Sequence, residues 1–70
     1  MIKILSKRYC YDNNVNRIKI IAKLSDKSTL ILFKTPIKGG PYSYFYYVLD
    51  SNMNFIYDIK YISIAQKLLY

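Results

Sequence analysis

The chain of 70 residues contains no histidine, no glutamate and no tryptophan, and it has a single cysteine. Without histidine or glutamate, a serine or cysteine nucleophile lacks the side-chain base that usually activates it. The four acidic residues are all aspartates, and three of them lie in turn-like sequences, where aspartate favours hydrogen bonds to the backbone. We therefore expect a protein that is not an enzyme, with no catalytic residues, no metal site and no cofactor.

The lone Cys10 cannot form an internal disulfide, which favours a reducing compartment, namely the cytoplasm, or the host-cell cytoplasm for a viral or phage protein. No window approaches the roughly 18 uncharged apolar residues of a membrane span. The first residues also lack the apolar stretch of a signal peptide. The length predicts one small domain, residues 1–70, of modest stability, and a homodimer would increase its buried surface.

Both glycines and both prolines lie in one segment, residues 35–41, which is therefore predicted to be the one long loop. Elsewhere β-branched and aromatic residues dominate, and turn-type residues interrupt them at short intervals, which is typical of a β-meander. The resulting strands are expected near residues 2–11, 15–24, 29–34, 42–49 and 55–61.

The C-terminal residues follow a different pattern. Ser63 with Gln66 fits a capping box, and the residues that follow favour helix. A start near Asp58 is the alternative, and it would shorten the fifth strand. The predicted fold is α+β and mostly β: a five-stranded antiparallel meander, forming a curled sheet or a small barrel, with a short C-terminal helix.

Alternation along the second predicted strand separates an apolar face from a cationic one. The apolar face holds Ile18, Ile20, Ala22 and Leu24, and the other face holds Arg17, Lys19, Ile21 and Lys23. Lys3 and Lys7 alternate in the same way on the first strand and are expected to extend this cationic stripe. The fourth strand is apolar or aromatic on both faces, so it is either buried on both sides or leaves tyrosines exposed.

Positive charge is confined to one half of the chain. Residues 1–38 hold nine cations and two aspartates, whereas the charges of residues 39–70 cancel. A sequence pI near 9.6 favours an acidic partner, such as nucleic acid, anionic lipid or an acidic protein surface. The predicted contact residues for nucleic acid or another acidic partner are Lys3, Lys7, Arg8, Arg17, Lys19, Lys23, Lys34 and Lys38.

Seven of the nine tyrosines lie in the second half of the chain. Three interpretations stay open: core packing, a protein interface, and stacking on the bases of single-stranded nucleic acid. Stacking requires aromatic rings and cations on one face, and here the cations are mostly on a different segment. The candidates for a protein interface are Tyr42, Tyr44, Tyr46 and Tyr47.

The first hypothesis is therefore a small binding protein whose basic half engages nucleic acid or a nucleoprotein complex. The alternative is a phage- or mobile-element-type inhibitor or adaptor that binds a host protein, for example a nucleic-acid-handling or defence enzyme, through its tyrosine-rich surface. Abundant Ile, Lys, Tyr and Asn, which have A/T-rich codons, indicate an AT-rich genome such as that of a low-GC bacterium, a phage or a virus. DNA, RNA and protein all stay open as the partner.

Overall fold

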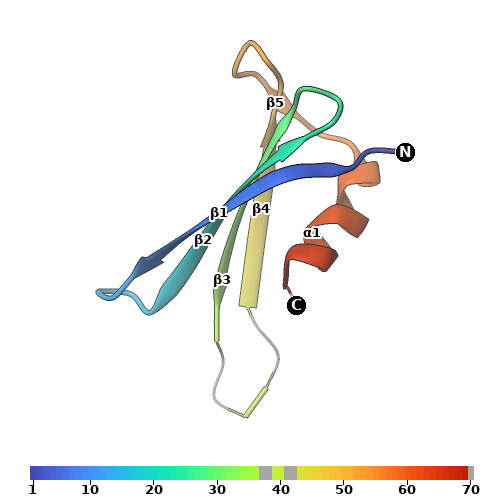
Figure 1. Ribbon diagram of the computed structural model, residues 1–70. Helices are drawn as coiled ribbons and strands as arrows, with labels where there is room; N and C mark the ends of the chain where they lie inside the picture. Colours follow the sequence, from blue (N-terminus) through green and yellow to red (C-terminus); the bar gives the residue numbers. More distant parts are fainter. Residues whose placement is uncertain (37–38, 41–42, 70) are drawn as a thin grey trace.

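The computed structural model describes residues 1–36, 39–40 and 43–69. Five antiparallel strands form one sheet in chain order, and a single helical segment follows them (Figure 1). The elements are β1 (Ile4–Asp12), β2 (Arg17–Leu24), β3 (Thr29–Thr35), β4 (Ser43–Leu49), β5 (Phe55–Ile56), the 3-10 helix η1 (Ile59–Tyr61) and α1 (Ile62–Leu69). The predicted fold, mostly β with a short C-terminal helix, is confirmed.

The sheet is open. Each strand pairs with its neighbours in the chain, so β1 and β5 form the two edges of the described sheet. The curled sheet is therefore the form that the chain adopts, and the small barrel is not formed. A register shift between Ile4 and Ser6 marks a bulge in β1, and such bulges increase the local twist of a strand.

Three aspartates shape the tight turns, as their sequence context predicts. The side chains of Asp12, Asp26 and Asp50 each accept the backbone N–H of the residue two positions later. The backbone of each turn also includes one residue in the left-handed region, which a reversal of the chain often requires. These residues are Asn16, Lys27 and Met53.

The core lies between α1 and one face of the sheet. Its sheet side contains the apolar face predicted for β2, and its helical side is formed by η1 and α1. The buried residues of this cluster are Ile20, Ala22, Leu24, Leu30, Leu32, Val48, Tyr61, Ile64, Ala65, Leu68 and Leu69. The covered side of the sheet is called the helix-covered face below.

The end of the chain corrects two details of the prediction. The fifth strand ends at Ile56 and not near Tyr61, because the Asp58 side chain accepts the Lys60 N–H and caps η1. Ser63 does not begin the helix; it lies inside α1, and its hydroxyl donates to the Lys60 carbonyl. The alternative start near Asp58 is thus closer to the observed helical segment.

Candidate nucleic-acid interface

The face of the sheet opposite α1 is covered by no other helix or strand of the described chain (Figure 1). We call this surface the open face. Directly paired residues of an antiparallel sheet share a face, so the register identifies its members. They include Arg8, Cys10, Arg17, Lys19, Ile21, Lys23, Ile31, Phe33, Phe45, Tyr47 and Phe55.

Five aromatic rings cross the open face from β3 to the segment after β5. The rings of Phe33 and Phe45 are stacked, with centroids 4.9 Å apart and planes 21° apart. Tyr47 lies 6.4 Å from Phe33 and meets Phe55 edge-on at 5.6 Å. Phe55 in turn stacks on Tyr57 at 6.1 Å. We call Phe33, Phe45, Tyr47, Phe55 and Tyr57 the aromatic row.

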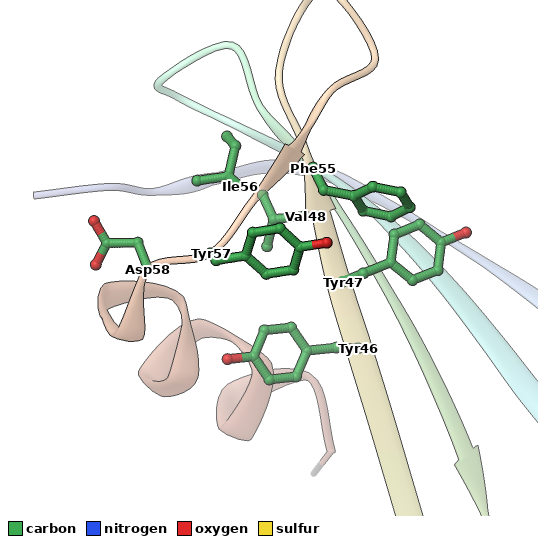
Figure 2. Close-up of a pocket in the computed structure, with 7 residues that line it drawn as sticks. All are labelled: Tyr46, Tyr47, Val48, Phe55, Ile56, Tyr57 and Asp58. Atoms are coloured by element: carbon green, nitrogen blue, oxygen red, sulfur yellow. The ribbon is translucent and has the colours of Figure 1, made fainter.

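Three rings of the aromatic row remain accessible to solvent. The exposed fractions are 54% for Phe45, 57% for Phe55 and 90% for Tyr57. Figure 2 shows Tyr47, Phe55 and Tyr57 close together at the end of β5. A contiguous exposed apolar patch on a small protein is a mark of an interaction surface. These rings are therefore available to a ligand.

Two cations adjoin one end of the aromatic row. The Arg17 guanidinium lies 4.9 Å from the centroid of the Phe33 ring, and the Lys19 ammonium lies 5.7 Å from it. Both distances are within the range of a cation–π contact. Asp12 pairs with Arg17 at this end of the sheet, and its carboxylate accepts the Asn14 N–H. The cations and the accessible rings thus occupy one continuous surface.

The structure brings together only part of the predicted basic set. Arg8, Arg17, Lys19 and Lys23 share the open face. Lys7 does not extend this stripe, because it pairs with Ala22 and therefore lies on the other side of the sheet. Lys3 precedes β1, where its N–H donates to the Ser25 hydroxyl at 2.8 Å. Lys38 lies outside the described residues.

Lys34 also lies away from the open face. Its side chain is only 9% exposed, and its ammonium donates to the Leu69 carbonyl at the end of α1, 2.9 Å away. A cation at this position interacts favourably with the C-terminal end of a helix. The structure thus gives Lys34 a role in holding α1 on the sheet.

The predicted tyrosine set is divided between the two faces of β4. Tyr47 belongs to the aromatic row, whereas Tyr44 and Tyr46 pair with Lys34 and Leu32 on the helix-covered face. Figure 2 shows Tyr46 and Tyr47 leaving β4 on opposite sides. Tyr42 lies outside the described residues.

The site residues predicted from the sequence do not include the phenylalanines Phe33, Phe45 and Phe55, nor Tyr57. A usable signal was present, because the tight turn between β2 and β3 sets their register. With that turn centred on Asp26 and Lys27, Lys19 comes opposite Phe33. The cation and the aromatic ring therefore share a face although they lie on different strands.

Asp26 and Tyr61 have shifted pKa values, and the contact between them holds the helical segment on the sheet. The buried Tyr61 donates its hydroxyl to Asp26 at 2.5 Å, and the Ser28 hydroxyl donates to the same carboxylate. Burial would raise the pKa of Asp26, but these hydrogen bonds outweigh it and hold the pKa below its usual value. Burial, together with the bond to Asp26, raises the pKa of Tyr61.

The described residues contain no cluster of three or more side chains suited to holding a metal ion. None of the helices in residues 1–36, 39–40 and 43–69 is long and apolar enough to cross a membrane. No protein-family model matches the chain, and no curated protein or solved structure matches it either. We therefore infer a function from the geometry of the open face.

Proposed function

We propose that this protein binds single-stranded nucleic acid on the open face. The observation that carries the proposal is that the aromatic row has three exposed rings and meets Arg17 and Lys19 at Phe33, all on one surface. Proteins that bind single strands combine a basic surface for the phosphates with aromatic rings for the bases. A non-enzymatic role fits this surface, since stacking and phosphate contacts need no reactive group.

The two ends of the aromatic row have different parts in this proposal. Phe33 is enclosed between Phe45 on one side and Arg17 with Lys19 on the other, so it supports the surface. Phe45, Phe55 and Tyr57 are the rings with free area, and they would receive the bases. The phosphates would then contact the cations of β1 and β2, namely Arg8, Arg17, Lys19 and Lys23.

Unpaired bases fit this surface better than a duplex. In a duplex, each base already stacks on its neighbours, and its flat side is inaccessible to a protein ring. A single strand can splay its bases onto aromatic side chains, and this stacking depends little on sequence. We therefore expect weak sequence preference and strong dependence on salt.

The proposal is tested by fluorescence anisotropy with labelled oligonucleotides of about 12 nucleotides. Single-stranded DNA, single-stranded RNA and a duplex of the same length are compared at one salt concentration. We expect either single strand to bind at least about tenfold more tightly than the duplex, since stacking adds roughly 1–3 kcal/mol per base. Equal affinity for the duplex would contradict base stacking and leave only phosphate contacts.

The lone cysteine offers a second readout of the same event. Cys10 is exposed and pairs with Lys19 at the edge of the open face. A fluorophore attached to Cys10 should change its emission when a single strand occupies this face. The reducing cytoplasm is the compartment that we propose for a protein with an exposed free thiol.

A further inference from the structure

One edge of β4 lacks a partner strand over most of its length. β4 spans Ser43–Leu49, but β5 consists of Phe55 and Ile56 and pairs only with Leu49 and Val48. Among the described residues, no strand lies along the remaining edge, residues 43–47. Figure 1 shows β4 continuing well beyond the end of β5. This segment is called the free edge below.

The backbone groups that point out of the free edge can be identified. The Asp50 N–H donates to the Asn54 carbonyl at 2.9 Å, toward the β5 side of the hairpin. Because these groups alternate in direction along an antiparallel strand, the N–H and C=O groups of Tyr44 and Tyr46 point the same way. An edge of this kind is a template for the backbone of an added strand.

Two hollows flank the free edge. A groove of about 600 Å³ separates it from α1 and is lined by Tyr44, Ser63, Gln66, Lys67 and Leu69. A smaller pocket of about 270 Å³ lies where β5 ends, between Tyr46 and Tyr57 (Figure 2). An added strand would place alternate side chains toward the groove and toward the open face. The free edge is therefore accessible on both sides.

We propose that the free edge binds an extended peptide segment of another protein, which adds to the sheet as a sixth strand. The segment would alternate acidic and apolar side chains. Its acidic side chains would face the groove, where Lys67 is the charged side chain among the described lining residues. Its apolar side chains would lie beside Phe45 and Tyr47 on the open face. In strand addition of this kind, the backbone hydrogen bonds provide the affinity, and pockets for alternate side chains provide the specificity.

A second copy of this chain is a poorer occupant of the free edge. Each copy carries a net charge of +7, so two copies repel each other at this distance. The edge itself, Ser43–Tyr47, contributes no carboxylate to face Lys67 of a partner. An acidic peptide can form hydrogen bonds with the unpaired backbone groups of the free edge, and its carboxylates can pair with Lys67 in the groove.

The test uses a labelled peptide of about seven residues that alternates Val and Glu, which spans the free edge at about 3.4 Å per residue. The control peptide alternates Val and Lys. We expect the Glu peptide to bind, as measured by fluorescence anisotropy, and the Lys peptide not to bind. Absence of binding by the Glu peptide up to about 1 mM, or equal binding by both peptides, would overturn the proposal.

Two variants at one position isolate the backbone contribution. Tyr44→Pro removes an N–H that points out of the sheet, whereas Tyr44→Ala keeps it, and proline is tolerated at an edge of this kind. Relative to Tyr44→Ala, we expect Tyr44→Pro to weaken peptide binding about fivefold, the effect of one backbone hydrogen bond. Equal affinities of the two variants would show that the peptide does not pair with this edge.

Amide hydrogen exchange on the unaltered protein gives a readout that does not depend on the folding of a variant. The amides of Tyr44 and Tyr46 should exchange rapidly in the free protein and become protected when the Glu peptide is bound. Unchanged exchange at both amides would overturn the proposal. Dimerisation at the free edge would instead protect these amides without peptide, in proportion to protein concentration, and would also overturn it. Because Tyr44 lies off the open face, these outcomes are distinct from failure of nucleic-acid binding.

Discussion

Lys19 and Phe33 face each other across β2 and β3, with the Lys19 ammonium 5.7 Å from the centroid of the ring. Phe33 also stacks on Phe45, so this pair connects the cations of β2 to the aromatic row. In the proposed complex, a base on Phe45 would place the phosphate backbone near Lys19, because Phe45 pairs with Phe33, the partner of Lys19. The contact between these two residues underlies the first prediction.

Charge reversal at Lys19 should weaken binding of single-stranded nucleic acid more than charge reversal at Lys7. Lys19→Glu and Lys7→Glu change the net charge equally, but Lys7 lies on the helix-covered side of the sheet. We expect Lys19→Glu to reduce affinity about fivefold more and to lower the salt slope by about 0.7, which corresponds to one lost phosphate contact. Anisotropy titrations from about 50 to 200 mM salt measure both quantities. Equal losses would mean that net charge alone governs binding.

Substitution of Lys34 should reduce mainly the stability of the protein, whereas substitution of Lys23 should reduce mainly nucleic-acid binding. Lys34→Met removes the donor that holds the Leu69 carbonyl, and we expect a loss of about 1–2 kcal/mol in the free energy of unfolding. Lys23→Met removes an exposed cation of the open face and should weaken nucleic-acid binding with little loss of stability. Urea denaturation and anisotropy on both variants check the contrast. If Lys34→Met weakened nucleic-acid binding more than Lys23→Met, the phosphates would bind the helix-covered face, which would contradict the proposal.

The contact between Tyr61 and Asp26 should limit stability at both ends of the pH scale. The pKa of Asp26 is lowered by folding, so its contribution is complete above its ordinary value of 3.8 and is lost as the pH falls through the folded pKa. The pKa of Tyr61 is raised from 10.0, so its contribution is complete below that pH and is lost as the pH rises through the folded pKa. Unfolding free energies measured below pH 4, at neutrality and above pH 10 test both statements.

Phenylalanine variants provide the matched control for this pH dependence. Tyr61→Phe should cost about 1 kcal/mol near neutral pH, through loss of one hydrogen bond, and should flatten the alkaline decline. Tyr57→Phe removes an equivalent hydroxyl from a ring that is 90% exposed, and it should leave both stability and the alkaline decline unchanged. If the two variants behave alike, the Asp26 contact does not contribute to the alkaline limit.

Local patterns in the sequence were sufficient for most of the fold. Turn residues such as Asp26 and Asp50 separate the strands, and alternation along β2 identifies the face that the core buries. The position of the helical segment on the sheet was harder to predict, because Tyr61 at the end of η1 contacts Asp26, 35 residues away in the chain. Local propensity contains no information about such a contact.

The candidate site depended on strand register, which the sequence constrains less. The first turn was expected at Asp12, Asn13 and Asn14, but the pairing of Asp12 with Arg17 leaves residues 13–16 in the turn. A shift of one residue moves every side chain of a strand to the other face. For this reason Arg8, and not Lys7, shares the open face with Lys19. The stacking interpretation becomes the favoured one only when the strands are paired.

The most direct test of single-strand binding on the open face compares two neighbouring residues of β4. Phe45 and Tyr44 are 54% and 39% exposed and point to opposite faces of the sheet. Their alanine variants are titrated with the same single-stranded oligonucleotide at one salt concentration, after circular dichroism has shown that both fold. Base stacking on the open face predicts that Phe45→Ala binds about tenfold more weakly than the unaltered protein, whereas Tyr44→Ala binds as the unaltered protein does. Equal affinities of the two variants would contradict the account.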